Sequence, residues 1–414
     1  MASHFLLLSD ALTLERLSWT EEVLKYYFIQ FSPEALRRPV PEKNPAFLLF
    51  LTGDALYSLF GRETSQIWDI ILSLPSLKVI CDQQELDLRG LSIDPLKVKF
   101  PGLVSSRQSV PEGSQPSFWG AVVDAARAQA PEEITIGYFQ VQSPYMHRAA
   151  LYALLCLESA LERDCNPELY SFLDGIHIGH TNQHPIAFRN LGEGLSDLAS
   201  HALQHQRHCL ILGSAPCASE RGYGMWDDGK RLVISSCTIK PLKLRSLTDM
   251  VERFTKDHSI LGTNSGSIQI RQDHTGMADG LSVKDHAPPS LIILITGSPY
   301  TTEMAMGALS FAIASAHQGI ETRVVFIENG VYALSGEQKT DMAEQFFSLQ
   351  DMINSASRND RLEFFAHQPS LHQRGLVKNK KFNAVLDINN HDLGKLLFEP
   401  PQGVRCRYQR LLFF

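Results

Sequence analysis

The chain lacks the features that mark disulfide-rich, membrane-spanning and nucleic-acid-binding proteins. It has 7 cysteines in 414 residues and no CxxC pair, which argues against a disulfide framework and favours a reducing compartment, the cytoplasm. No apolar run approaches the roughly 18 residues of a membrane-spanning helix. No basic segment precedes the short apolar run near the start, so no signal peptide is expected. The formal net charge of −7 argues against direct binding of nucleic acid.

One local pattern occurs in three parts of the chain. In two of them it opens with Ser-Pro-Tyr and continues with Asp-Gly or Asn-Gly, whose glycine lies 30 residues past the tyrosine. An apolar run ending in Arg-Gly follows, and the first part holds a looser copy. Such a repeat indicates one structural unit used three times. The pattern residues are Gly53-Asp54 and Arg89-Gly90, then Ser143 to Tyr145, Asp174-Gly175 and Arg221-Gly222, then Ser298 to Tyr300, Asn329-Gly330 and Arg374-Gly375.

Strand-like and helix-like stretches alternate along the chain. In the last third, Ser290–Thr296 is an almost continuous apolar run, which predicts a strand buried on both faces of a parallel sheet. Glu303–His317 predicts the helix that follows. Strands alternating with helices imply right-handed parallel crossovers. We therefore expect an α/β fold of three tandem three-layer units with mostly parallel sheets: domains at 1–130, 131–275 and 286–414, and a linker at 276–285.

The same patterns predict the other elements. In open parallel sheets the working crevice lies beyond the carboxyl ends of the strands, so the loops that follow the strands are expected to hold any site. The further expected strands are His4–Leu8, Ala46–Leu51, Leu77–Cys81, Ile134–Val141, Leu169–Leu173, Cys209–Gly213, Leu232–Ser235, Ser259–Gly262, Thr322–Ile327, Leu362–Ala366, Phe382–Ile388 and Tyr408–Phe414. The further expected helices are Phe118–Ala128, Met146–Arg163, Leu191–His205, Leu247–Phe254 and Met342–Ser355.

Several of these segments resemble the DsrE family, the small α/β subunits of the TusBCD and DsrEFH sulfur-relay complexes. VVFIENGVYAL, HQPSLHQRGL and the ending YQRLLFF, in the last unit, are similar to the TusC or DsrF type. QSPYMHRAALYAL and GSAPCASERGY, in the middle unit, are similar to the TusD or DsrE type. KVICDQQELDLRGL and SFWGAVVDAARA, in the first unit, resemble the TusB or DsrH type. The resemblance implies three DsrE-like domains fused in one chain.

The resemblance also implies a sulfur-carrying cysteine at the end of the third strand, where a helix begins and nearby cations favour a thiolate. Counting back eight residues from the glycine of Arg-Gly gives Ser214 in the middle unit and His367 in the last. Neither side chain can hold a persulfide. Two nearby cysteines are therefore the candidates, Cys217 three residues beyond Ser214 and Cys81 at the corresponding strand end of the first unit. Each could equally be a buried, inert core residue.

The repeated polar residues have two interpretations. Arg89, Arg221 and Arg374 could pair with a thiolate or an anion in the crevice, or could form structural contacts within each unit. Ser143, Tyr145, Ser298 and Tyr300 could line a pocket. Alternatively, Ser-Pro-Tyr is a strand-to-helix turn with proline at the first helical position.

The middle unit is rich in histidine, which raises the question of a zinc site. His177, His180 and His184 fall in one loop. His201, His205 and His208 have the spacing of one helix face. The two triplets are expected at opposite edges of the sheet, so a shared site is disfavoured. No metal or other cofactor is expected.

Two functions remain open. The first is a fused sulfur relay that takes persulfide sulfur from an upstream donor and passes it to a small carrier protein of the TusE or DsrC kind, as a sulfurtransferase-like carrier. A homodimer is then expected, since the separate subunits of the family assemble as paired trimers. The second is a DsrE-like scaffold or binding protein that has lost the sulfur-carrying cysteine.

Overall fold

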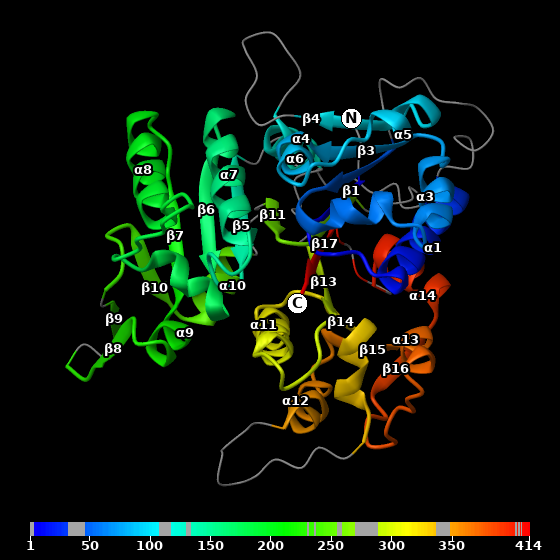
Figure 1. The fold of residues 1–414 in the computed structure, drawn as a ribbon. Helices are drawn as coiled ribbons and strands as arrows, with labels where there is room; N and C mark the ends of the chain where they lie inside the picture. Colours follow the sequence, from blue (N-terminus) through cyan, green and yellow to red (C-terminus); the bar gives the residue numbers. More distant parts are fainter. Residues whose placement is uncertain are drawn as a thin grey trace, which may run out of the picture. The chain divides into compact units, whose positions relative to one another are not determined.

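The chain is an α/β protein with mostly parallel sheets (Figure 1), as predicted. It divides into two compact units, Met1–Leu17 with Arg37–Ser265 and Ser18–Leu36 with Gly266–Phe414. The predicted linker at 276–285 and the predicted domain ends next to it lie outside the described residues, as do residues 130 and 131. The computed structural model describes residues 4–31, 46–106, 117–129, 134–229, 232–235, 237–254, 259–269, 289–336, 348–401, 404, 406 and 408–414.

The first unit begins with four parallel strands in the order β1-β2-β3-β4. Leu8 pairs with Leu51 and Leu51 with Cys81, so the carboxyl ends of three strands are level. The strands are β1 (His4–Leu8), β2 (Phe47–Leu51), β3 (Leu77–Asp82) and β4 (Leu103–Ser106). The helices among them are the 3-10 helix η1 (Gly53–Phe60), α3 (Ser65–Leu72), α4 (Gln83–Leu88), α5 (Asp94–Lys99) and α6 (Phe118–Gln129).

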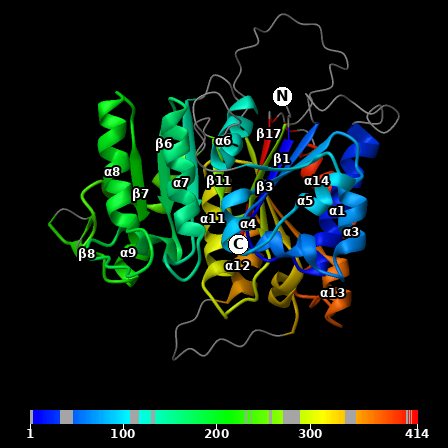
Figure 2. The ribbon, with the colours of Figure 1, turned by 45° about the horizontal axis from the view of Figure 1, so that its top comes forward.

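A second, five-stranded parallel sheet completes this unit, in the order β10-β7-β6-β5-β11. Figure 2 shows β6 of this sheet next to helix α7. Its strands are β5 (Thr135–Gln140), β6 (Asn166–Ser171), β7 (Leu210–Ser214), β10 (Leu242–Arg245) and β11 (Ser259–Gly262). The helices are α7 (Ala149–Glu162), η2 (Leu173–Gly179), α8 (Leu191–Gln204), α9 (Ala215–Glu220) and α10 (Leu247–Phe254). β8 (Gly224–Asp227) and β9 (Leu232–Ser235) form an antiparallel hairpin.

One hydrophobic core serves both sheets of the first unit. Phe5 and Phe50, from the four-stranded sheet, belong to the same buried cluster as Ile136 from the five-stranded sheet. Helices α6 and α7 pack against each other in this cluster, and the rings of Trp119 and Tyr152 lie 5.5 Å apart. Burial of large aromatic side chains is a main source of folding free energy, so the two sheets depend on each other for stability.

The second unit contains the parallel strands β16-β15-β14-β13-β17, with β12 beside β17. All six residues of β13 are buried, as its apolar sequence predicts. The strands are β12 (Ser265–Gln269), β13 (Ser290–Ile295), β14 (Thr322–Phe326), β15 (Leu362–His367), β16 (Val385–Ile388) and β17 (Tyr408–Phe413). The helices are α11 (Met304–His317), η3 (Glu328–Leu334), α12 (Leu349–Ala356), α13 (Gln368–Gln373) and α14 (Asn390–Phe398).

Helix α1 (Leu14–Phe31) comes from the start of the chain, yet from Ser18 onward it belongs to the second unit. The indole N–H of Trp19 donates to Glu328 Oε1 at 3.1 Å. Its ring stacks on Phe413 with a centroid distance of 6.2 Å. Tyr26 lies so close to Gly394 of α14 that a Cβ there would be 2.7 Å from the tyrosine ring. The second unit is therefore built from segments far apart in the sequence.

Most predicted elements are present within two or three residues of their expected ends. Strands β4, β8, β10 and β12 and helices α1, α3, α5 and α14 were not predicted, nor were the 3-10 helices η1, η2 and η3. Residues 342–347 of the predicted helix 342–355 lie outside the described residues. No helix in the described part of the chain has the length and apolar character needed to cross a membrane.

Candidate functional site

The same strand-to-helix junction occurs three times. Each of β3, β7 and β15 is followed at once by a six-residue helix. The N-cap residues have nearly equal backbone angles: φ −73°, ψ 108° at Asp82, φ −63°, ψ 118° at Ser214 and φ −74°, ψ 106° at His367. The position eight residues before the Arg-Gly glycine is therefore the helix N-cap in all three units. The sequence count predicted this position for Ser214 and His367, whereas in the first unit the candidate Cys81 lies one residue before the N-cap Asp82.

The arginine of each Arg-Gly pair ends the short helix and makes the same contact. Arg89 donates to Asp54 at 2.9 Å, and Arg221 donates to Asp174 at 2.8 Å. Each acidic partner lies at the start of the 3-10 helix after the second strand. In the last unit Arg374 donates to Asn329 in the same way, at 3.0 Å. These contacts support the structural interpretation of the three arginines. Each arginine joins the end of the short helix to the start of the 3-10 helix, at the carboxyl edge of the sheet.

The glycine after each arginine has a left-handed backbone, with φ between 63° and 77° for Gly90, Gly222 and Gly375. Only glycine adopts this conformation without strain, and a left-handed residue directly after a helix is a common C-terminal cap.

In the middle junction the candidate thiol is buried. Cys217 is 5% exposed and lies at the third position of α9, within reach of the hydroxyl of Ser214, which is 1% exposed. Burial raises the pKa of the Cys217 thiol, although contacts with Ser214, the backbone of Leu173 and the charge of Arg221 act in the opposite direction. The thiol is therefore mostly protonated near neutral pH, unlike the activated cysteine of a typical sulfur carrier.

In the first junction Cys81 is completely buried inside β3. Burial, with a smaller effect of the neighbouring Asp82 charge, raises the pKa of the Cys81 thiol far above its usual range. Asp82 is the N-cap, and its carboxylate accepts from the backbone N–H groups of Gln84 and Glu85 and from the Thr52 hydroxyl. Burial, together with the charge of Glu85, raises the pKa of Asp82 to about 7.

In the last junction His367 is 1% exposed and both of its ring nitrogens are engaged. Nε2 lies 2.8 Å from Asn390 Oδ1, an acceptor, so this nitrogen carries the proton. Nδ1 lies 2.7 Å from the Ser370 hydroxyl, whose oxygen accepts from the N–H of Glu328. His367 thus links its own short helix to the loops at Glu328 and Asn390.

The two Ser-Pro-Tyr segments form the same turn. Tyr145 and Tyr300 have left-handed backbones, with φ of 65° and 61°. Each hydroxyl accepts, at 3.1 Å, the N–H of the first residue of a following helix, Leu191 of α8 and Leu349 of α12. Helices α7 and α11 begin several residues after the prolines, so proline at the first helical position was the wrong interpretation. Ser143 and Ser298 are half-buried in these turns.

The histidine prediction was wrong in one respect. Helix α8 ends at Gln204, and Gln206 has φ 56°, so His208 lies beyond the helix and not on a face shared with His201. His177 Nδ1 lies 2.6 Å from the Tyr223 hydroxyl. Within the described residues, no group of three His, Cys, Asp or Glu side chains is arranged to hold a metal ion.

Cys237, a cysteine with no recognisable motif around it, is exposed. Its backbone has φ 56°, and its carbonyl accepts the N–H of Thr181 in the histidine-rich loop. Among the described cysteines, Cys237 is exposed, Cys209 is half-buried and the other five are buried.

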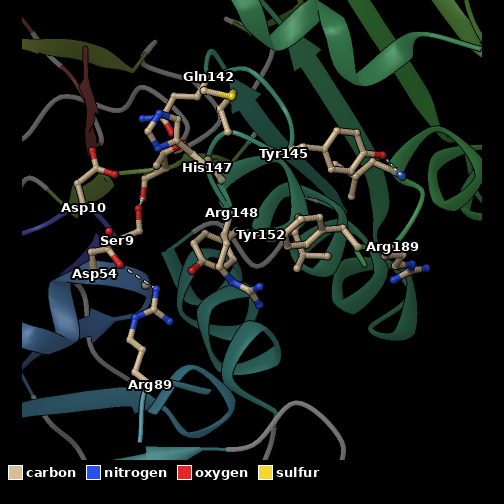
Figure 3. Close-up of a pocket in the computed structure, with 17 residues that line it drawn as sticks. Ser9, Asp10, Asp54, Arg89, Gln142, Tyr145, His147, Arg148, Tyr152 and Arg189 are labelled. Carbon is tan, nitrogen blue, oxygen red and sulfur yellow. Dashed lines mark hydrogen bonds and ion pairs between the residues drawn. The ribbon is translucent and has the colours of Figure 1, made fainter. Parts of the chain in front are cut away.

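A pocket of about 300 Å³ lies within the first compact unit, at the carboxyl ends of β1, β2 and β5 (Figure 3). Of the predicted site residues, Tyr145 and Arg89 line it; Ser143, Ser214, Cys217 and Cys81 do not. Sequence reasoning missed its other polar lining residues, chiefly Asp10, His147, Arg148 and Arg189. Asp10 could have been found from its place directly after the first strand, since that edge of the sheet was expected to hold any site.

Beneath the pocket, Glu85 is completely buried and holds several cationic and hydroxyl groups. Arg148 Nε donates to it at 2.8 Å, and the Tyr152 hydroxyl donates at 2.9 Å. Arg89 also pairs with it. A buried carboxylate without such partners would be strongly destabilising, so these contacts connect α4 of the first sheet to α7 of the second.

Comparison with known proteins identifies the last part of the chain. Residues 290–397 match the model of the DsrE/DsrF-like family. A segment of 57 residues is 37% identical to an uncharacterized protein of Methanocaldococcus jannaschii, and this segment covers 14% of the chain and 50% of that relative. The matched domain runs from β13 to α14 and contains the junction at His367. Residues 290–397 therefore form a DsrE/DsrF-like domain.

Proposed function

We propose that the chain is a fused sulfur-relay protein made of three DsrE-like units, of the TusB/DsrH, TusD/DsrE and TusC/DsrF types in that order. The main support is the junction that occurs after β3, β7 and β15. Each time the strand is followed by an N-cap, a six-residue helix, an arginine and a left-handed glycine. One of these junctions lies in the domain that matches the DsrE/DsrF-like family. The other two have the same local backbone, which supports extending the family assignment to them.

The proposed chemistry is persulfide exchange. The Cys217 thiolate attacks the outer sulfur of a donor persulfide, the donor S–S bond breaks, and the donor leaves as a thiolate while Cys217 becomes the persulfide. The reverse exchange passes that sulfur to a small carrier of the TusE or DsrC kind. Cys217 is preferred over Cys81 because it lies in the first turn of a helix beside Arg221, which both favour a thiolate.

A homodimer remains part of the proposal, since symmetric dimers are the commonest oligomers. In the family, three separate subunits form a trimer and two trimers pair, so two copies of a fused chain would correspond to that assembly. The upstream persulfide donor and the small carrier protein are the proposed partners.

One observation favours a second function, a scaffold without sulfur chemistry. The three N-cap positions hold Asp82, Ser214 and His367, none of which has a thiol. Cys217 is only 5% exposed, and its thiol pKa is raised. Such a chain would keep the loops of the crevice edge as a docking surface for a partner enzyme.

Intact mass separates these functions. The reduced protein is incubated with a cysteine desulfurase and cysteine, and any gain of one sulfur atom is mapped by peptide digestion. We expect the gain on Cys217, its absence in Cys217→Ser, and its retention in the matched control Cys237→Ser. Because burial raises the pKa of Cys217, the extent of charging should increase as the pH rises from 7 to 9.

The other outcomes are equally informative. A gain that maps to the exposed Cys237 would keep the relay and overturn the assignment to Cys217. If a control carrier is charged by the same donor while no cysteine of this chain gains sulfur, the relay is rejected and the scaffold is the better description.

A further inference from the structure

The pocket of the first unit is separate from the sulfur chemistry proposed above. Neither Cys217 nor Cys81 lines it. It lies at the carboxyl ends of β1, β2 and β5, and its volume of about 300 Å³ is at the small end of the range for ligand sites. In Figure 3, Asp10 and Asp54 lie on one side, Tyr145 and Arg189 on the other, and Arg148 between them.

One wall is acidic and has free acceptor capacity. Asp10 Oδ2 accepts from Asn264 at 2.6 Å, and Asp54 Oδ1 accepts from Arg89 at 2.9 Å. Among the described residues, the other oxygen of each carboxylate has no hydrogen-bond partner. The side chain of Asp54 is 62% exposed. Two carboxylates held in place by one oxygen each, with the second oxygen available, suit a ligand ammonium group, which has three donors.

The middle of the pocket is basic. Arg148 uses Nε and Nη2 to hold buried Glu85, at 2.8 and 2.6 Å. Its side chain lines the pocket and is 29% exposed, which leaves part of the guanidinium open to a ligand. The exposed His147 adjoins it in sequence and also lines the pocket. A guanidinium whose orientation is already set by Glu85 is a preorganised donor to a ligand carboxylate.

The balance of charge excludes a simple ion as the best ligand. Arg89, Arg148 and Arg189 line the pocket. They are matched by the carboxylates that bind them, those of Glu85, Asp54 and Glu158. Asp10 adds one further carboxylate, so the pocket has little net charge, holds both acidic and basic groups and complements a ligand that carries both charges.

The remaining wall is apolar, and its residues come from the middle sequence repeat. Tyr145 and Leu151 are half-buried there, and Leu191 is 3% exposed. Phe188 and Met146, at 59% and 77% exposed, lie at the rim. Aromatic rings and methionine sulfur pack well against aliphatic and thioether groups.

We propose that this pocket binds a free amino acid with an apolar or sulfur-containing side chain. The ligand ammonium lies against Asp10 and Asp54, the carboxylate against Arg148, and the side chain along Tyr145, Leu151 and Leu191. The site is independent of persulfide transfer, so it stands whether the chain is a relay or a scaffold.

The test uses the full-length protein and L-methionine as the probe, with calorimetric titration and thermal unfolding. Its matched analogues are 3-(methylthio)propylamine, which lacks the carboxylate, and 4-(methylthio)butanoate, which lacks the ammonium. We expect L-methionine to bind and to raise the unfolding midpoint, and either analogue to bind at least about ten-fold more weakly. Asp10→Asn combined with Asp54→Asn should weaken binding of L-methionine by a similar factor.

The variants keep the hydrogen bonds to Asn264 and Arg89, because an asparagine oxygen accepts as the carboxylate does. Asp249→Asn, an exposed change outside the pocket, is the control for the loss of a surface carboxylate. Unfolding midpoints without ligand establish that each variant is folded. Phe188→Ala, at an exposed rim position, supplies a second variant that leaves the core intact and should weaken binding.

Three results overturn the proposal. They are no binding of L-methionine, binding of either analogue as tightly as the amino acid, and binding that is unchanged in the double variant and in Phe188→Ala.

Discussion

Asp82 is the helix N-cap of the first sequence repeat, as Ser214 and His367 are of the middle and last repeats. Unlike them, it carries a carboxylic acid. Its carboxylate caps α4, yet it is completely buried and near the charge of Glu85. The cost of burying this charge explains why the pKa of Asp82 is about 7 rather than 3.8. The folded state therefore binds a proton at Asp82 more tightly than the unfolded state does.

The sign of the pH effect follows from this difference. The stabilising contribution of Asp82 is complete below about pH 4 and is lost as the pH rises to about 7. Asp82→Asn keeps the cap acceptor and removes the charge. We expect the variant to match the wild type at pH 4 and to be more stable by about 1–3 kcal/mol at pH 8.

Thermal unfolding across this pH range measures the effect. Asp87→Asn, an exposed change on the same helix, is the control and should leave the pH dependence as it is. A variant that loses stability at pH 8 would show that the Asp82 charge is needed rather than costly.

At the scale of single elements, the 3-10 helices η2 and η3 can form only where a glycine lets their backbone lie close to the end of the neighbouring strand. The 3-10 helix η3 starts where Ile327 N–H donates to the carbonyl of Ile295, the last residue of β13. A Cβ at Gly330 would lie 1.9 Å from that same carbonyl oxygen. Gly175 repeats this contact in the middle unit, with 2.1 Å to Gln140. The Asn-Gly and Asp-Gly pairs in the repeat are thus explained by steric fit.

Gly330→Ala should therefore be strongly destabilising, by more than about 3 kcal/mol, because backbone and not a flexible side chain would have to move. Gly297→Ala is the matched control, since a Cβ added at Gly297 would have no neighbouring atom within 4 Å. Urea unfolding compares the two. Equal stability of both variants would mean that η3 adjusts easily to a larger residue.

At the scale of the whole molecule, the compact units do not follow the sequence repeats. The two sheets of the first unit share one core, and α1 contributes Trp19 and Tyr26 to the second unit. The stability of the DsrE/DsrF-like domain therefore depends on residues more than 250 positions earlier in the chain.

Trp19→Ala tests this dependence. Trp19 is 1% exposed, and removal of a buried tryptophan costs about 3–5 kcal/mol. We expect faster amide hydrogen exchange in β17 and η3, which hold its partners Phe413 and Glu328. Trp19→Phe, which keeps an aromatic ring but loses the N–H donor, should have a smaller effect. Unchanged exchange in both elements would show that the second unit does not need α1.

Hydrophobic periodicity predicted nearly every strand, because a strand buried on both faces must be apolar at successive positions, as β13 is. It missed α1, whose run of Tyr26 to Ile29 consists of residues that favour strands. Counting along the repeat identified the N-cap positions at Ser214 and His367. The count works because a six-residue helix, an arginine and a left-handed glycine follow the N-cap in each repeat, so the number of residues from N-cap to glycine is constant.

The sequence by itself determined the α/β class, the repeated junctions and the N-cap positions at Ser214 and His367, because these depend on local spacing and backbone conformation. Tertiary structure alone decided how buried each cysteine is: Cys217 is enclosed, whereas Cys237 is exposed. It also decided the pocket, whose Asp10 and Arg148 are 138 residues apart. The burial of a cysteine and the meeting of pocket residues both depend on contacts between segments that are distant in the sequence, so a local sequence pattern cannot predict them.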